Sequence, residues 1–195
     1  MELYLYAPNP DLEPEYLMNY EIGVNHKTSD RKLDGGITIF YIDAKNIIQV
    51  MPNKNPPPPD KRYNTGSFTN KGIELELNWI ANNKLHFSSN YSYLDLDRPR
   101  LAAPKNQLYI DGTYIYKKLR ANLSLQQISG LYTSLGNPSP LEENYSLVNA
   151  MISLKLTNNV ELYVSGKNLL DQDYAINFGY PMPGITVFSG VNLTF

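Results

Sequence analysis

Apolar and polar residues alternate one for one over most of the chain. The clearest example is Ile73-Glu74-Leu75-Glu76-Leu77-Asn78-Trp79, in which aliphatic and aromatic residues share one face and Glu74, Glu76 and Asn78 share the other. Successive side chains of a strand point to opposite faces of its sheet, so the pattern predicts a β-strand with one apolar and one polar face. No helix-length pattern with a period of 3.6 residues is present, and we expect an all-β fold.

The same alternation recurs along the chain. It predicts roughly nine antiparallel strands between Tyr16 and Phe195. Most of them have the length of about 9–11 residues that a tilted membrane strand requires. The expected apolar faces, in chain order, are Leu85, Phe87, Ser89, Tyr91 and Tyr93; Leu108, Ile110, Tyr114 and Tyr116; Leu119, Ala121, Leu123 and Leu125; Val148, Ala150, Ile152, Leu154 and Leu156; Val160, Leu162, Val164 and Gly166; and Ile185, Val187, Val191, Leu193 and Phe195.

The connections between these strands fall into two classes that alternate strictly. The short ones are Ser29–Lys32, Asn82-Asn83, Lys117-Lys118 and Asn158-Asn159, where Asn tolerates the positive φ of a tight turn. The long ones are Met51–Lys61 with Pro56 to Pro59, Arg98–Lys105, Thr133–Asn144 and Asp171–Gly184. Tight turns on one rim and long loops on the other are typical of an antiparallel transmembrane β-barrel, with the short turns periplasmic. A soluble β-sandwich need not separate its connections in this way.

Composition is compatible with such a barrel and excludes several other classes. The mean hydropathy of −0.38 and the absence of a run of about 18 apolar residues exclude a helical membrane protein. The net charge of −2 gives no electrostatic reason to expect nucleic acid as a partner. Cysteine is absent, which favours a bacterial or cytosolic protein. The 16 tyrosines suit strands that cross a wet–dry boundary, and equally a carbohydrate-binding face.

The chain ends in Ser189-Gly190-Val191-Asn192-Leu193-Thr194-Phe195. This segment resembles the C-terminal β-signal of bacterial outer-membrane proteins, which the Bam insertion machinery reads. The resemblance rests on a polar residue at Ser189, a glycine at Gly190, a hydrophobic residue at Leu193 and an aromatic residue at Phe195. Counted from the last long loop, the final strand runs inward and places Phe195 in the periplasm.

Further segments, in order, resemble the late barrel of TonB-dependent receptors. The most informative is Gly166-Lys167-Asn168-Leu169-Leu170-Asp171-Gln172-Asp173-Tyr174, followed by Gly179-Tyr180-Pro181-Met182-Pro183-Gly184. The others are Asn9-Pro10-Asp11-Leu12-Glu13-Pro14-Glu15, Asn19-Tyr20-Glu21-Ile22-Gly23, Phe40-Tyr41-Ile42-Asp43 with Lys45-Asn46, Asn70-Lys71-Gly72-Ile73-Glu74-Leu75-Glu76, Asn90-Tyr91-Ser92-Tyr93 and Ala103-Pro104-Lys105. Together they cover nearly the whole chain.

The resemblance implies a barrel of about 22 strands around an N-terminal plug domain, in the outer membrane of a Gram-negative bacterium. Residues 1–195 would supply the C-terminal part of that barrel, and the plug, the segment that couples to TonB and the earlier strands would be absent. No secretion signal is visible at Met1-Glu2-Leu3-Tyr4, so we expect the export signal to lie upstream. The implied partners are outer-membrane lipid, the Bam machinery, TonB through the missing part, and a small-molecule chelate.

No catalytic constellation is apparent, and we expect neither an enzyme nor a bound cofactor or metal. The histidines are His26 and His86, and His86 falls on a polar strand face. Asp95 and Asp97 adjoin a long loop, where a cation site or an ordinary solvated rim is possible. Ligand contacts are expected from aromatic residues of the long loops and the upper lumen, although an outer aromatic girdle would use the same residues and is the favoured role for most of them: Tyr63, Tyr132, Tyr145, Phe178 and Tyr180. Trp79, Tyr114 and Tyr116 suit an inner girdle.

Three functions are compatible with these patterns. The first is an outer-membrane receptor for energy-coupled uptake of a large, scarce nutrient, most often an iron–siderophore or related chelate in the family that the chain resembles. The second is a small stand-alone outer-membrane barrel or adhesin with a binding or structural role. The third is a soluble β-sandwich that binds glycans.

Overall fold

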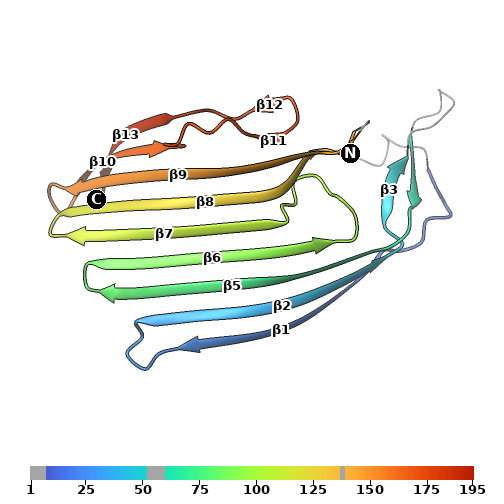
Figure 1. Cartoon of the computed structure of the whole chain (residues 1–195), viewed down its shortest axis with the longest axis horizontal. Helices are drawn as coiled ribbons and strands as arrows, with labels where there is room; N and C mark the ends of the chain where they lie inside the picture. The colour runs from blue at the N-terminus through green and yellow to red at the C-terminus, as the bar shows by residue number, and fades with distance from the viewer. Residues whose placement is uncertain (1–7, 52–59, 137–138) are drawn as a thin grey trace.

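The computed structural model describes residues 8–51, 60–136 and 139–195, and within them one nine-stranded sheet dominates (Figure 1). No helix in these residues is long and apolar enough to cross a membrane. The strands of the sheet are β1 (Tyr16–Lys27), β2 (Leu33–Lys45), β5 (Phe68–Asn82), β6 (Leu85–Leu96), β7 (Asn106–Tyr116), β8 (Leu119–Ser134), β9 (Leu141–Lys155), β10 (Val160–Lys167) and β13 (Thr186–Leu193). The expectation of an all-β antiparallel sheet with nine strands is confirmed.

Each strand of the sheet pairs antiparallel with the next one in the order β1-β2-β5-β6-β7-β8-β9-β10-β13. The short turns all lie at one end of the molecule, together with the C-terminus, and the long connections lie at the other (Figure 1). Among the described strands, β1 and β13 each have one neighbour and do not pair with each other. The sheet is therefore a single open layer, which rules out the two packed sheets of a β-sandwich.

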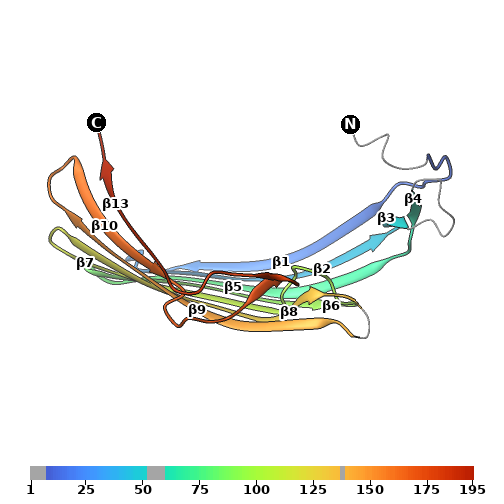
Figure 2. The same cartoon turned by 90° about the horizontal axis from the view of Figure 1, so that it is seen from above.

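The two faces of this sheet differ in crowding. Nearly all the buried residues within the nine strands lie on the face that carries Glu74 and Glu76, among them Thr113, Ser124 and Ser153. Seen from above, the sheet is bowed, with both ends rising to the same side (Figure 2). Bowing crowds side chains on the concave face and spreads them on the convex face, so the polar face is the concave one.

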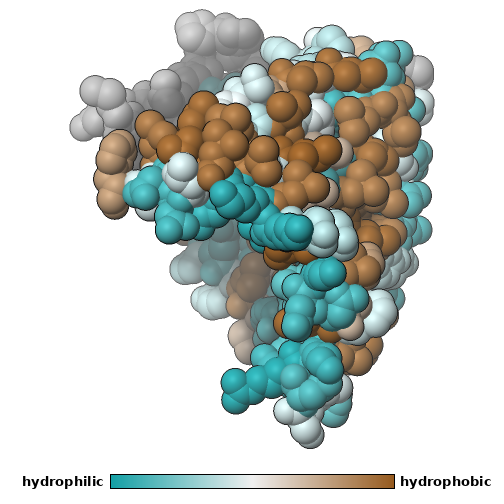
Figure 3. Space-filling model, turned by 90° about the vertical axis from the view of Figure 1, so that its left-hand side faces the viewer, coloured by the Kyte–Doolittle hydropathy of each residue, from teal (hydrophilic) through white to brown (hydrophobic). Residues whose placement is uncertain are grey.

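The convex face is apolar and exposed. Ile22 is 71% exposed, Leu123 58% and Val187 65%. Seen from the short-turn end, brown surface covers much of the sheet, whereas the turn between β1 and β2 at the bottom is teal (Figure 3). On β5 the apolar row runs from Ile73 to Trp79, roughly 20 Å at about 3.4 Å per residue, close to the apolar height of about 25 Å in outer-membrane barrels.

The short turns use a different local chemistry from the one expected. Asn82 and Asn83 do not adopt a positive φ. Instead the Asn82 side-chain oxygen accepts a hydrogen bond from the Lys84 amide at 2.9 Å, while Lys117 takes the positive φ of 53° in its own turn. In the turn between β1 and β2, the Thr28 hydroxyl donates to the Asp30 carboxylate at 2.7 Å and, with the Lys32 backbone amide, lowers the pKa of that carboxyl.

The long connections are more ordered than their sequences predict. The first contains the hairpin of β3 (Ile48–Met51) and β4 (Lys61–Asn64), while Pro56 to Pro59 lie outside the described residues. β8 and β9 extend as far as Ser134 and Leu141, well into the expected loop 133–144. The last connection contains the pair β11 (Ala175–Asn177) and β12 (Tyr180–Pro181). The final strand ends at Leu193, so Phe195 lies beyond it.

We predict that Leu75→Lys, on the convex face, destabilises the membrane-inserted protein by about 2–4 kcal/mol, because it places an ammonium group in the apolar band. Glu76→Lys is the matched control, since the adjacent residue projects from the concave face. The measurement is the free energy of unfolding by urea in phospholipid vesicles. Equal losses from both variants would contradict the assignment of the convex face to lipid.

Candidate functional site

The long-connection end of the sheet is organised around Asn168, directly after β10. This residue is 4% exposed and adopts a φ of 51°. Its side-chain amide donates to the carbonyl oxygens of Gln172 at 2.9 Å and Pro183 at 3.1 Å, and its side-chain oxygen accepts from the Gln172 amide at 2.9 Å. Its backbone amide donates to Asn149 of β9 at 3.0 Å. One side chain thus joins both ends of the connection 168–185 to each other.

Asp171 completes this anchor. Its amide donates to the Asn168 carbonyl oxygen at 2.9 Å, and its carboxylate accepts from the Ile185 amide at 3.1 Å, just before β13. Asp171 also has a positive φ, 50°. In the sequence, this segment was noted only for its resemblance to a known family, and no structural role was predicted for Asn168 or Asp171. The pair Asn-x-x-Asp, with two residue types that tolerate the left-handed region, was the signal for a tight, hydrogen-bonded loop base.

A small aromatic core holds the rest of this connection against the sheet. Tyr145 of β9 is 8% exposed, and its ring centroid lies 4.4 Å from that of Tyr174. It packs in a buried cluster with Ile128, Leu131 and Leu147 on the concave face. Tyr145 was expected to be a ligand-facing residue of a loop, but it lies inside a strand and is covered, so it supports the loop instead.

Two of the expected aromatic residues meet in one hollow. Phe178 and Tyr180, 65% and 74% exposed, line a cavity of about 420 Å³ together with Leu141. Glu142, Glu143 and Asp173 also line it, and none of its lining residues is basic. The backbone amide of Phe178 donates to the Thr133 carbonyl oxygen at 3.1 Å, which fixes the β11–β12 hairpin to the end of β8. The cavity offers aromatic faces and carboxylates to a ligand.

The remaining two aromatic residues lie elsewhere. Tyr132 of β8 lines a separate cavity of about 160 Å³ with Asp97, Arg98 and Lys105. Tyr63 belongs to the β3–β4 hairpin and is 44% exposed. The Lys61 ammonium lies 5.5 Å from its ring centroid. The structure therefore brings Phe178 and Tyr180 together and leaves Tyr63 and Tyr132 apart from them.

The β3–β4 hairpin is tied to the chain before β1. The Asn64 side-chain amide donates to the carbonyl oxygens of Glu13 at 2.9 Å and Asn46 at 2.7 Å, and its side-chain oxygen accepts from the Glu13 amide at 2.9 Å. The Ile48 amide donates to the Glu15 carboxylate at 2.6 Å. These bonds join residues up to 51 positions apart and hold the hairpin over the start of the sheet.

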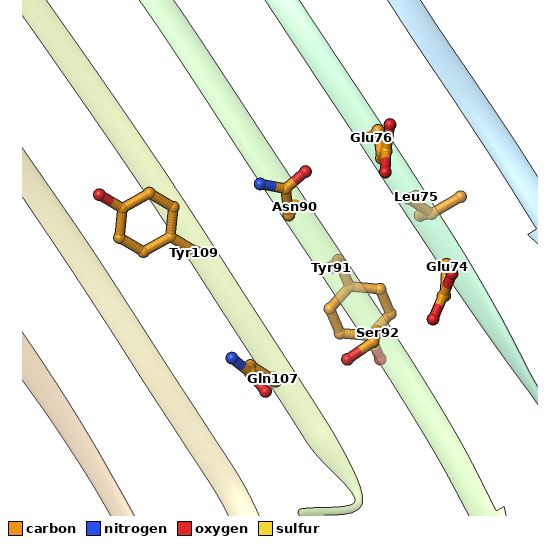
Figure 4. Close-up of a pocket in the computed structure, with 8 residues that line it drawn as sticks. All are labelled: Glu74, Leu75, Glu76, Asn90, Tyr91, Ser92, Gln107 and Tyr109. Carbon is orange, nitrogen blue, oxygen red and sulfur yellow. The ribbon is translucent and has the colours of Figure 1, made fainter. Parts of the chain in front are cut away.

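The concave face is a polar wall that was not singled out as a site. Its central hollow has a volume of about 250 Å³ and is lined by side chains from β5, β6 and β7. Figure 4 shows these side chains on their adjacent strands. β5 provides Glu74 and Glu76, β6 provides Asn90 and Ser92, and β7 provides Gln107 and Tyr109. Cross-strand pairing aligns them, for example Glu76 with Asn90 and Asn90 with Tyr109. The alternation of polar residues was the signal for this wall.

In the part of the chain that the structure describes, the titratable residues form no other candidate site. Asp95 pairs with Lys71 at 3.3 Å, and Asp97 lies 3.6 Å from Arg98, as expected for a solvated rim. In the strand register His86 lies opposite Ile80 of β5 and Thr113 of β7. Its side chain is on the concave face, as the alternation predicted. Within the described ranges, no group of His, Cys, Asp and Glu could hold a metal ion.

The C-terminal segment shows a structural role for one of its residues. Gly190 pairs with Tyr163, and a Cβ on Gly190 would lie 2.6 Å from the Tyr163 hydroxyl oxygen. The tyrosine ring thus lies across the glycine. Ser189 and Leu193 project from the convex face, and Phe195 is fully exposed.

Comparison with known proteins identifies the family. A family model described as "TonB dependent receptor-like, beta-barrel" matches residues 2–169. The vitamin B12 transporter BtuB of Photobacterium profundum is 27% identical over 186 residues, which are 90% of this chain and 30% of that protein. The chain thus spans about a third of the length of such relatives.

Solved structures share the fold. The FrpB iron transporter of Neisseria meningitidis superposes with a TM-score of 0.79 at 16% identity, over 95% of this chain and 32% of that one. The siderophore receptor PirA of Acinetobacter baumannii gives a TM-score of 0.74 at 19% identity, over 95% of this chain and 32% of that one.

We predict that Asn168→Ala destabilises the connection 168–185 by about 1–3 kcal/mol. The change removes the side-chain bonds to the carbonyl oxygens of Gln172 and Pro183, which are part-buried, and alanine disfavours the positive φ. The measurement is the rate of limited proteolysis within 168–185 in the folded protein. Asn158→Ala, in an exposed turn, is the control. A cleavage rate equal to that of the control would refute the anchoring role.

We predict that Gly190→Ala lowers the amount of folded protein in the outer membrane by displacing the Tyr163 ring, and that the double variant Gly190→Ala/Tyr163→Ala restores it. The measurement is the folded fraction in isolated outer membranes. If the double variant stays as low as the single one, Gly190 is required by the insertion machinery and not by the close approach of Tyr163.

Proposed function

Because the chain belongs to the TonB-dependent receptor-like β-barrel family of the Gram-negative outer membrane, we propose that it forms the wall and outer mouth of an energy-coupled nutrient transporter. The observation that carries the proposal is the division of one sheet into a convex apolar face and a concave polar face. A polar wall such as Glu74, Glu76 and Asn90 suits a hydrated or protein-filled interior, and not a second apolar layer.

The substrate class we propose is a large metal chelate, and specifically an iron–siderophore complex. Two of the compared proteins are named as an iron transporter and a siderophore receptor, and a third as a vitamin B12 transporter. The cavity with Phe178 and Tyr180 offers exposed rings to a planar ligand. Its carboxylates favour a ligand that presents a positively charged group to this side.

A stand-alone barrel or adhesin is less well supported. A closed barrel of these strands requires β1 to pair with β13, and the two strands are not paired. Open strand edges are costly in lipid because their amide and carbonyl groups find no partner. We infer that further strands complete the barrel, and that coupling to TonB and the Bam-mediated insertion of the protein follow the pattern of the family.

The test is whole-cell uptake in a strain that lacks the gene, under iron limitation, with iron-55 chelates and labelled vitamin B12 as probes. We expect loss of uptake of one iron chelate, restoration by the complete gene, and inhibition by a protonophore. Normal uptake of every probe, combined with loss of surface attachment, would favour the adhesin.

We predict that Phe178→Ala/Tyr180→Ala weakens chelate binding roughly ten-fold while the protein still inserts, because both rings are exposed and support no core. Tyr114→Ala, which removes an exposed ring from the convex face, is the control. The measurement is the dissociation constant of the chelate on intact cells. An unchanged dissociation constant would exclude the cavity as the ligand site.

A further inference from the structure

The short-turn end of the sheet carries unbalanced positive charge. The four short turns, residues 28–32, 83–84, 117–118 and 156–159, contain five basic residues and one acidic residue: Arg31, Lys32, Lys84, Lys117, Lys118 and Asp30. Asp30 pairs with Lys32 at 3.3 Å. Among the described residues, no ion pair involves the lysines of the two turns between β5 and β6 and between β7 and β8, which are Lys84, Lys117 and Lys118. Lys118 donates to the Leu156 carbonyl oxygen at 2.9 Å, which leaves Lys84 and Lys117.

Next to these turns, four aromatic residues form a row along the convex face, which we call the aromatic ladder: Trp79, Phe87, Tyr114 and Tyr116. Trp79 and Phe87 stack with ring centroids 5.6 Å apart, and the Phe87 ring extends over the bare backbone of Gly112. Tyr114 and Tyr116 follow on the same face of β7, nearer to the turn. Trp79, Tyr114 and Tyr116 are 46%, 43% and 44% exposed. The ladder thus presents rings to lipid, with the more polar phenols at the rim, as at a membrane interface.

Two lysines flank the lowest ring of this ladder. The Lys84 ammonium lies 5.2 Å from the Tyr116 ring centroid, and the Lys117 ammonium lies 5.4 Å from it. The lysines come from neighbouring hairpins, so the sheet pairing of β6 with β7 brings them together. Both lysine side chains are exposed, and the Tyr116 hydroxyl is a further hydrogen-bond donor on the same ring. This arrangement offers two positive charges and a donor directly below an apolar surface.

We propose that Lys84, Lys117 and Tyr116 bind the phosphate of an anionic phospholipid headgroup in the leaflet at the short-turn end, with its acyl chains along the ladder of Tyr114, Phe87 and Trp79. In outer-membrane barrels the short turns face the periplasm, so the leaflet concerned is the inner, phospholipid leaflet. The headgroup supplies the negative charge that the turns lack, and the acyl chains cover the rings. Lysines near a bilayer surface attract anionic lipid by about 1 kcal/mol each.

At the opposite end of the sheet, the Lys105 ammonium lies 6.0 Å from the Tyr93 ring centroid. Asp95 and Asp97 follow Tyr93 in the sequence, and both line the same cavity as Lys105. This lysine–tyrosine contact therefore has carboxylates beside it, unlike the contact at Tyr116. Lys105 is for this reason the matched control.

The experiment uses the protein as cells produce it, purified from outer membranes and reconstituted in phosphatidylcholine vesicles. Trp79 is the one tryptophan of these 195 residues, and subtraction of the Trp79→Phe signal isolates its fluorescence. Quenching is measured with small amounts of acyl-brominated phosphatidylglycerol, and separately with brominated phosphatidylcholine. The ratio of the two reports the preference for the anionic headgroup next to Trp79.

We expect phosphatidylglycerol to quench preferentially, and the preference to fall roughly five-fold for each of Lys84→Gln and Lys117→Gln. Lys84→Arg/Lys117→Arg should keep the preference, as should Lys105→Gln. Unchanged preference in the glutamine variants, or an equal loss in Lys105→Gln, would overturn the proposal. Displacement by millimolar inorganic phosphate would also overturn it, since the site would then take a free anion. These readouts do not involve transport, so they stand apart from the proposed uptake function.

Discussion

The structure depends on the requirement that every backbone amide and carbonyl group of a membrane-crossing segment has a hydrogen-bond partner within the protein. Lipid offers none, and each unpaired group costs several kcal/mol. Between β1 and β13 the chain meets this requirement with one continuous antiparallel ladder of backbone hydrogen bonds, and only the outer edges of those two strands are left open among the described strands. Once the ladder is fixed, side chains must alternate between two faces. The remaining features follow from that alternation: an apolar convex face, a polar concave face, and two rims of different character.

Pairing of strands places an additional demand on particular positions. At two cross-strand pairs a large aromatic ring leans over its partner position, and that position is a glycine. Phe87 extends over Gly112 on the convex face, and Tyr163 lies across Gly190 on the concave face. In each case an aromatic ring occupies the volume that a second side chain would need. Gly190 therefore has a packing role that is separate from the C-terminal signal predicted by the sequence.

The two rims solve different problems. At the long-connection end, irregular backbone must be held in place without strand pairing. Asn168, Asp171 and Asn64 do this through hydrogen bonds between their side chains and backbone groups. That leaves Phe178 and Tyr180 free to project from a fixed base. At the short-turn end the backbone is tight, and the side chains of Lys84 and Lys117 meet at the Tyr116 ring, where we propose that a lipid headgroup binds. One rim is thus suited to a diffusing ligand and the other to the membrane itself.

The sequence by itself determined the fold class, the nine strands of the main sheet and the faces of the strands from Ile73 onward, but it did not predict the hairpins β3–β4 and β11–β12. A period of two is a local property, and residues such as Ile73 and Glu74 carry it without reference to any partner strand. It also indicated the family and the outer-membrane location. The prediction for Asn82 and Asn83 was wrong in its detail, because several turn geometries satisfy the same two residues.

Only the tertiary structure decided what non-local pairing controls. Tyr145 looked like a loop residue, but the extension of β8 and β9 buries it beneath Tyr174. Phe178 and Tyr180 share a cavity with Glu142, which lies more than thirty positions earlier, whereas Tyr63 belongs to another hairpin. Lys84 and Lys117 meet at Tyr116 because two strands pair. Contacts of this kind depend on register and on loop anchoring, and neither can be read from the alternation of residues along one strand.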